Sequence, residues 1–218
     1  MIPVTVFTAR IIANVAPGLA EALALPEGLR SIALLSTDCD DATYIALDEA
    51  TKAAAVEVVY GRSLYAGAAN ASTRLAGEVI GILAARDPTQ VQSGLRAALA
   101  VLDRLGFEPA NAAGDIVYLA HCVSASGSYL SKAAGVSPGT ALAYLIAPPV
   151  EALEGLDQAL KAAEVQLSTF YAPPTETNFA GALLTGSQSA CEAACQAFAQ
   201  AVRQVAQQPK HLNESQKT

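Results

Sequence analysis

Several residue types and patterns are scarce in this 218-residue chain. It has no tryptophan, one methionine and two histidines, and charged residues make up only 15% of it. No uncharged apolar run approaches the roughly 20 residues that a membrane-spanning helix needs, so we expect no association with a lipid membrane. Residues 1–13 lack a basic start followed by a long apolar stretch, and Arg10 interrupts them. No signal peptide is therefore expected.

Clusters of basic residues are also missing. Lys and Arg total 13 against 20 Asp and Glu, which gives a net charge of −7. Because phosphate binding needs clustered Lys and Arg, nucleic acid is excluded as a partner. The acidic balance would suit a small cationic ligand.

Sequence motifs of catalytic and metal centres are absent. There is no nucleophile elbow, Gly-rich phosphate loop, HExxH or Cys-rich zinc pattern. The four cysteines are expected to be reduced thiols: Cys39, Cys122, Cys191 and Cys195. Cys191 and Cys195 share one helix face, but zinc needs four donors and nothing completes the set. We expect no metal, no cofactor and no enzyme activity, and structural roles for His121 and His211.

The chain does contain an internal repeat. The segment LDEATKAAAVEV at residues 47–58 reappears as LDQALKAAEVQL at residues 156–167, with seven of twelve positions identical. The two copies therefore start half a chain length apart. The sequence thus predicts two tandem domains, residues 1–108 and 109–209, and a polar tail at residues 210–218. With 52% hydrophobic residues, much apolar surface is expected to be buried between subunits.

Short strands and helices alternate in both halves. Strands are predicted at residues 4–15, 32–36, 56–60 and 77–84, and again at 115–124, 141–147, 165–171 and 179–185. Helices are predicted at residues 18–23, 48–55, 87–106, 128–134, 156–163 and 189–207; Asp87 caps the third, with Pro88 next, and Gly106 stops it. This mixture predicts an α+β fold in which each half is a small, mainly antiparallel sheet with helices packed on it.

Two features could carry function. The acidic segment Asp38-Cys39-Asp40-Asp41 follows a predicted strand, and its three carboxylates repel one another unless a cation or backbone donors offset them. The other interpretation is a solvated, helix-capping turn. The loops at residues 61–73 and 172–178 occupy matching repeat positions, and in a ring of subunits they would line one axis. The other interpretation is ordinary surface loops.

Four segments carry a family resemblance. They are STDCDDATYIALDEATKAAAVEVVYGRSLYAGAA (36–69), YLAHCVSASGSYLS (118–131), AYLIAPPVEA (143–152) and PPTETNFAGALLTGSQSACEAAC (173–195). From about residue 9 to residue 206 the chain resembles the EutL-type tandem-domain shell proteins of ethanolamine-utilising bacterial microcompartments. The resemblance implies two tandem circularly permuted bacterial microcompartment (BMC) domains. It also implies a flat homotrimer that mimics a hexagon, packed edge to edge with other shell proteins in the bacterial cytoplasm.

The resemblance also implies two kinds of pore. A gated central pore for metabolites or cofactors would be lined by loops that include Arg62, Ser63, Leu64, Tyr65, Ala66, Gly67, Glu176 and Phe179, with Tyr65 as the plug. A smaller pore in each subunit would bind ethanolamine through Asp40, Asp41, Glu78, Phe107, Thr177 and Asn178. Carboxylates would satisfy the ammonium group and polar loop groups the hydroxyl. Exposed or half-exposed carboxylates would give binding on the order of millimolar, or about 4 kcal/mol.

The prediction is therefore a structural shell protein with a gated pore. A soluble small-ligand-sensing module built from tandem α+β domains is the alternative. An enzyme is a third hypothesis, motivated only by the acidic segment.

Overall fold

The computed structural model describes residues 1–63, 79–173 and 179–210. Its contacts divide the chain into two compact units. Unit 1 contains Met1–Gly106 and Val123–Thr140, and unit 2 contains Phe107–Cys122 and Ala141–Thr218. The boundary predicted at residue 108 divides the chain between the two copies of the repeat, whereas the compact units are defined by contacts. The division into two repeat domains therefore stays a prediction. The compact units interleave, because a segment of the second half belongs to unit 1.

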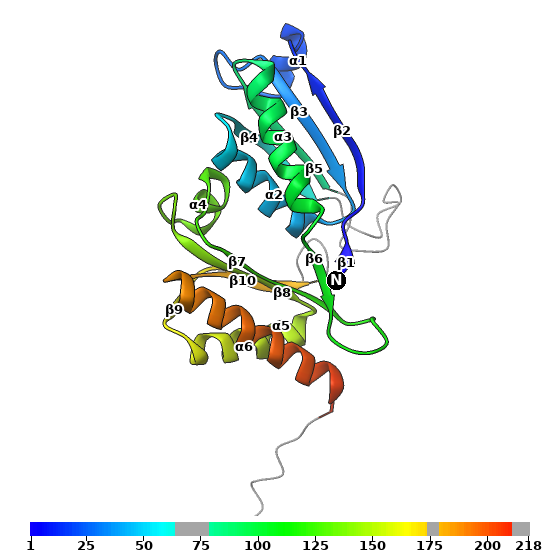
Figure 1. Cartoon of the computed structure of the whole chain (residues 1–218), viewed down its shortest axis with the longest axis vertical. Helices are drawn as coiled ribbons and strands as arrows, with labels where there is room; N and C mark the ends of the chain where they lie inside the picture. The colour runs from blue at the N-terminus through cyan, green and yellow to red at the C-terminus, as the bar shows by residue number, and fades with distance from the viewer. Residues whose placement is uncertain (64–78, 174–178, 211–218) are drawn as a thin grey trace, which may run out of the picture. The chain divides into compact units, whose positions relative to one another are not determined.

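Unit 1 is built on an antiparallel sheet. Its strand order is β2 (Val6–Ile12), β3 (Ser31–Thr37), β5 (Val79–Ala85), β4 (Glu57–Ser63). The helices α2 (Asp40–Ala53) and α3 (Pro88–Leu102) pack beside each other on this sheet (Figure 1). The short elements β1 (Ile2–Pro3), α1 (Pro17–Ala22) and α4 (Ser128–Ala134) complete the unit.

Both faces of the central strands in unit 1 are covered, which explains their apolar sequences. On one face, Leu47 of α2 lies so close to Gly81 that a Cβ there would meet its side chain at 2.8 Å. On the other face, Ile32 and Ile82 form a cluster against which leucines near α1 pack. The pairing of β3 with β5 is fixed by this alternation, because a slip of one residue would exchange the two faces.

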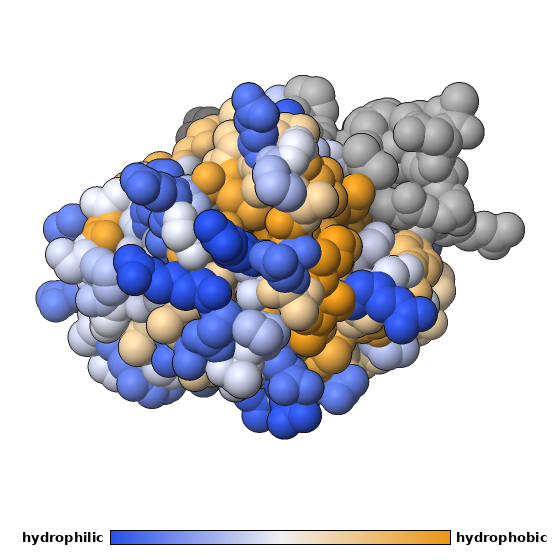
Figure 2. Space-filling model, turned by 90° about the horizontal axis from the view of Figure 1, so that it is seen from above, coloured by the Kyte–Doolittle hydropathy of each residue, from blue (hydrophilic) through white to orange (hydrophobic). Residues whose placement is uncertain are grey.

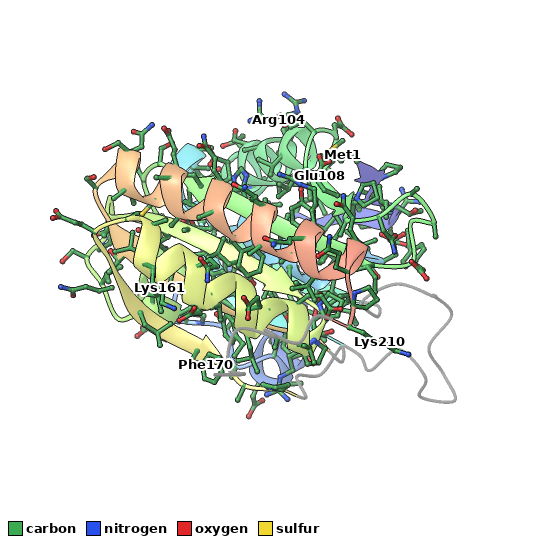
Figure 3. All side chains as sticks on the ribbon, turned by 90° about the horizontal axis from the view of Figure 1, so that it is seen from below. Met1, Arg104, Glu108, Lys161, Phe170 and Lys210 are labelled. Atoms are coloured by element: carbon green, nitrogen blue, oxygen red, sulfur yellow. The ribbon has the colours of Figure 1, made fainter. Side chains whose placement is uncertain are left out.

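Unit 2 contains strands in the order β6 (Gly106–Pro109), β7 (Val117–Val123), β8 (Ala141–Ala147), β10 (Ala180–Gly186), β9 (Val165–Tyr171). The helices α5 (Pro149–Ala162) and α6 (Gln188–Gln207) lie side by side across it (Figure 3). Gly155 permits their close approach, since a Cβ there would meet the Phe198 ring at 2.7 Å. Phe198 is fully buried among small residues of β8 and β10.

The repeat predicted from the sequence is present in the fold. The order β2-β3-β5-β4 in unit 1 recurs as β7-β8-β10-β9 in unit 2. The helices also correspond, since the starts of α2 and α5, at Asp40 and Pro149, have the same separation as the sequence repeats at Leu47 and Leu156. The predicted α+β class with antiparallel sheets is confirmed.

Most predicted elements are confirmed within a few residues, and four details are wrong. The helices predicted from residues 48 and 156 begin earlier, at Asp40 and Pro149. Acidic residues and proline suit a first helical turn, because the free N–H groups there favour negative charge and proline lacks an N–H. Gly106 does not stop α3, which ends at Leu102, but opens the unpredicted strand β6. The loop predicted from residue 61 starts later, since β4 continues to Ser63.

The predicted capping of α3 by Asp87 is confirmed. The Asp87 carboxylate accepts hydrogen bonds from the N–H groups of Thr89 and Gln90, at 2.9 and 3.1 Å. The hydrogen bond that the Thr89 hydroxyl donates to Asp87 lowers the pKa of this carboxyl most, and the two backbone bonds lower it further. Gly135 ends α4 with φ of 66°, a left-handed conformation that glycine adopts without strain.

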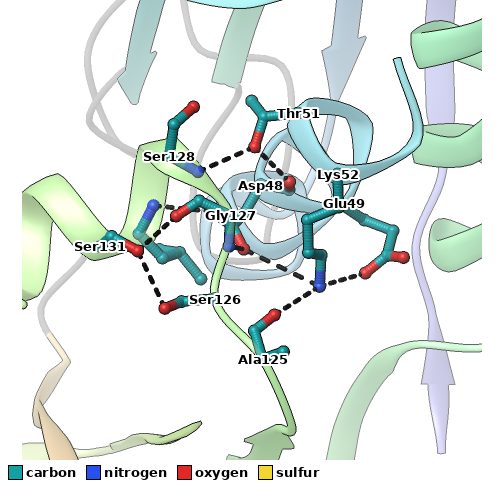
Figure 4. Close-up of polar contacts among 10 residues, drawn as sticks. Asp48, Glu49, Thr51, Lys52, Ala125, Ser126, Gly127, Ser128 and Ser131 are labelled. Carbon is teal, nitrogen blue, oxygen red and sulfur yellow. Dashed lines mark hydrogen bonds and ion pairs between the residues drawn. The ribbon is translucent and has the colours of Figure 1, made fainter. Parts of the chain in front are cut away.

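A buried carboxylate ties α4 to α2 within unit 1 (Figure 4). Asp48 on α2 is 0% exposed, and its oxygens accept hydrogen bonds from the N–H groups of Gly127 (2.7 Å) and Leu130 (2.8 Å). Burial raises the pKa of Asp48. The two hydrogen bonds lower this pKa by a smaller amount, so the net shift is upward. The side chain therefore supplies acceptors to the first turn of a helix from the other half of the chain.

Neighbouring groups reinforce this contact. The Thr51 hydroxyl accepts a hydrogen bond from the Ser128 N–H at 3.0 Å. Lys52 donates to the Ala125 carbonyl at 2.9 Å and lies 4.0 Å from Asp48. The approach requires glycine at position 127, because a Cβ there would lie 2.5 Å from the Asp48 carbonyl oxygen. Backbone atoms cannot move aside as a flexible side chain can.

Replacing Asp48 by asparagine tests this contact. Asp48→Asn places an amide N–H₂ against a backbone N–H, so one buried donor loses its acceptor. We expect the free energy of unfolding to fall by about 1–3 kcal/mol, measured by urea denaturation followed by circular dichroism. The control is Glu49→Gln on the same helix, whose 2.5 Å ion pair with Lys52 lies at the surface. It should change stability by less than about 1 kcal/mol. Equal losses in both variants would contradict this account.

Candidate functional site

The acidic segment is buried at the start of α2. The exposed fractions of Asp38, Asp40 and Asp41 are 7%, 5% and 7%. The interpretation of this segment as a solvated turn is therefore wrong, and so is the expectation that the carboxylates are exposed or half-exposed. The reason lies in the order of elements: β3 ends at Thr37 and α2 begins at Asp40, which leaves no room for a surface loop.

Local hydrogen bonds shape this acidic segment. Asp38 accepts a hydrogen bond from the Thr5 N–H at 2.8 Å. Asp40 accepts one from the Asp41 N–H at 2.9 Å. Both Asp40 and Asp41 stand in the first helical turn, where the helix dipole favours negative charge. The backbone thus compensates part of the cost of burying these carboxylates.

The only thiol in this segment is not poised for nucleophilic chemistry. Cys39 is buried, and burial, followed by the charge of Asp41, raises the pKa of its thiol well above the usual value. It is therefore a neutral thiol at physiological pH, whereas a nucleophile needs the thiolate. The side chains that the segment offers for binding are therefore its carboxylates.

The other residues expected at the ethanolamine site are only partly described. Phe107 on β6 and Phe179 before β10 bring their rings together in unit 2, with centroids 5.5 Å apart and planes tilted by 38°. No pattern in the sequence links these two rings, which come from distant parts of the chain. Glu78, Thr177 and Asn178 lie outside the described residues. Asp40 and Asp41 belong to unit 1, and Phe107 to unit 2.

The two expected pore loops leave the sheets at equivalent places, between β4 and β5 and between β9 and β10. At the base of the first loop, the Arg62 guanidinium lies over the Tyr60 ring, 5.5 Å from its centroid. The Ser63 hydroxyl is buried and has no hydrogen-bond partner in the part of the chain that the structure describes. Phe179 stands at the base of the second loop. Leu64, Tyr65, Ala66, Gly67 and Glu176 lie outside the described residues.

The remaining cysteines are packed in the core of unit 2. Cys191 and Cys195 lie one turn apart on the buried face of α6, as expected, and Cys122 packs against the same cluster. Burial raises the pKa of Cys195 to about 12 and that of Cys122 to about 11.

Within residues 1–63, 79–173 and 179–210, no group of three or more metal-binding side chains is placed to hold an ion. Among the same residues, no helix combines the length and hydropathy of a membrane span.

No protein-family model matches the chain. Curated relatives are nevertheless similar over nearly its whole length. The bacterial microcompartment shell protein EutL of Clostridium perfringens is 61% identical over 205 residues, 94% of each chain. EutL of Escherichia coli K12 is 52% identical over 201 residues, 92% of each chain.

A solved structure shows that the fold is shared as well. The crystal structure of the ethanolamine utilization protein EutL from Leptotrichia buccalis superimposes with a TM-score of 0.91. It is 57% identical in sequence, and the match covers 97% of this chain and 98% of the other. These relatives confirm the tandem α+β fold and the coarser role that the resemblance implied, that of a microcompartment shell protein. The chain belongs to the EutL family of bacterial microcompartment shell proteins.

Proposed function

We propose that the chain forms a flat homotrimeric tile in the shell of a bacterial microcompartment in the cytoplasm, packed edge to edge with other shell proteins. The observation that carries this proposal is the duplicated fold within a family of shell proteins. Each chain contributes two sheets of the same strand order, so three chains supply six like units. A closed ring of six such units has the outline of a hexagon, which can tile a layer.

Exposed apolar side chains support assembly. Phe7, Ile11 and Phe170 are 44%, 38% and 46% exposed, and several leucines are similarly open. On the face seen in Figure 2, hydrophobic residues gather into a continuous patch among polar ones. Large exposed apolar patches are unusual on monomers and mark interaction surfaces. Contacts with further subunits would cover them.

The central pore belongs to the same proposal. The loops between β4 and β5 and between β9 and β10 would line it, with Arg62, Ser63 and Phe179 at their bases and Tyr65 as the plug. Their equivalent positions in the two sheets support a shared axis. Movement of these loops would open and close a passage for metabolites or cofactors.

Each subunit would also bind ethanolamine. Asp40 and Asp41, with Glu78, would face the ammonium group, and Phe107, Thr177 and Asn178 would complete the site. Burial of Asp40 and Asp41 supports this role, since charges attract a cation more strongly where little water screens them. The cation must lose its own water, which offsets part of this gain.

The assembly itself is the first test. We expect the purified protein to elute from size-exclusion chromatography with multi-angle light scattering at three times its chain mass of 22.3 kDa. Electron microscopy of concentrated samples should show sheets. A stable monomer at all concentrations would remove the tile proposal. If that monomer bound ethanolamine, a soluble ligand-sensing module would be favoured instead.

The ethanolamine site is tested by calorimetry. Asp41→Asn removes one charge from the buried acidic segment at nearly constant size. Losing one charge-assisted hydrogen bond should weaken ethanolamine binding by about 1.5–3 kcal/mol, roughly 10- to 150-fold. The trimer should persist. Glu57→Gln neutralises an exposed carboxylate of the same unit and should bind like the wild type. Unchanged affinity in Asp41→Asn would exclude this residue from the site.

A further inference from the structure

The contact between α2 and α4 in unit 1 joins the two halves of the chain. Asp48 on α2 accepts hydrogen bonds from backbone N–H groups at the start of α4. The ring centroids of Tyr44 on α2 and Tyr129 on α4 lie 6.1 Å apart. Leu130 on α4 is only 2% exposed. The receiving face of α2 is thus formed by Tyr44, Asp48 and Thr51, one helical turn apart. Figure 4 shows Asp48 and Thr51 of this face.

Each partner in this contact has a counterpart in the other copy. The helix α5 corresponds to α2 with an offset in numbering of 149 − 40 = 109. The helix α1 corresponds to α4 with an offset of 128 − 17 = 111, the same as for the strands before them, 117 − 6 = 111. On α5 the receiving face therefore consists of Leu153, Asp157 and Leu160. On α1 the counterpart of Leu130 is Leu19.

These counterpart surfaces are open in the isolated chain. Leu153 and Leu160 are 48% and 40% exposed. Leu19 is 44% exposed, whereas Leu130 is buried. The ion pair of Asp157 with Lys161 lies on the surface, with both side chains at least half exposed. Figure 3 shows Lys161 on α5. The apolar surfaces of α1 and α5 are therefore exposed in the isolated chain, whereas the equivalent surfaces of α4 and α2 cover each other.

The residues that would meet between α1 and α5 differ from those between α4 and α2 on both sides of the contact. In the first contact the Ser128 N–H donates to the Thr51 hydroxyl. At the counterpart positions stand Pro17, which has no N–H, and Leu160, which has no hydroxyl. At these two positions a polar pair has become an apolar pair, so no N–H or hydroxyl is left there without a partner.

One difference changes the closeness of approach. Ala16 stands at the position of Gly127, whose lack of a Cβ lets α4 reach the backbone of α2. In an equivalent contact between two chains, α1 would therefore lie farther from α5 than α4 does from α2. The longer Leu160 side chain, in place of Thr51, fills the added space.

We infer that α1 of one chain docks on α5 of a second copy, with Leu19 buried against Leu153 and Leu160. This inference rests on the proposed trimer and names its contact surfaces. Because α1 and α5 are different surfaces, the contact is heterologous and can close into a ring. Around that ring, α4-on-α2 contacts within chains alternate with α1-on-α5 contacts between chains.

Substitutions that introduce a charge test the contact between α1 and α5, with the mass of the assembly as the measurement. Leu19→Asp and Leu160→Asp change side chains that are exposed in the isolated chain, so folding should persist by circular dichroism. Each should lower the mass measured by light scattering from that of a trimer to the 22.3 kDa of one chain. The control is Val150→Asp, also exposed on α5 but lining a groove with α6. It should keep the wild-type mass.

Cross-linking tests the same contact without disturbing assembly. The double variant Leu19→Cys with Asp157→Cys, treated with a short bismaleimide, should give bands of two and three chains on a denaturing gel. Each single variant should stay at one chain, because a heterologous contact does not bring identical residues together.

The outcomes separate this inference from the proposed function. A wild-type trimer that survives both charge substitutions, with no cross-linking above the single variants, would overturn the docking of α1 on α5 and leave the tile intact. A wild-type protein that never forms a trimer would overturn both.

Discussion

The buried carboxylate of Asp48 is the constraint on which the arrangement of the chain depends. It is 0% exposed, and its hydrogen-bond donors, Gly127 and Leu130, belong to the second half of the sequence. An unpaired carboxylate at this depth would cost several kcal/mol, and the two hydrogen bonds from α4 offset this cost. The second half of the sequence therefore contributes to the stability of unit 1. The chain leaves unit 2 after Cys122, completes unit 1, and returns to unit 2 at Ala141.

A comparison of the two copies shows that burial determines how much the repeated Asp–Lys pair contributes to stability. Asp48 and Lys52 recur as Asp157 and Lys161, with the same spacing. The second pair is closer, at 2.5 Å against 4.0 Å, yet it is exposed and contributes little to stability. The first pair is longer, but its carboxylate carries two buried backbone hydrogen bonds. The two copies thus hold one buried structural contact and one surface that is exposed in the isolated chain.

The sequence predicts elements well where a local signal marks their ends. The helix at 128–134 and the strand at 141–147 match the structure residue for residue, because Gly or Pro marks their ends. The strand at 165–171 also matches, two residues before Pro173. The starts of α2 and α5 are missed because the repeat match begins at residues 47 and 156, inside both helices. Burial of Asp38, Asp40 and Asp41 could not be predicted either. It depends on contacts such as that of Asp38 with Thr5, 33 residues away, and isolated acidic residues are normally solvated.

The acidic segment also has no equivalent in the second copy. At the corresponding positions of that copy, Pro149 and Val150 stand where Asp40 and Asp41 begin α2. Proline suits the first turn of a helix as well as an acidic residue does, so α5 forms without a buried charge. The acidic start of α2 therefore has no counterpart at the start of α5. In the proposed trimer, three of the six units would carry it, and ligand binding would follow threefold rather than sixfold symmetry. Any effect of the ligand on a central pore would then act through one unit of each chain, with the other unit as a passive part of the tile.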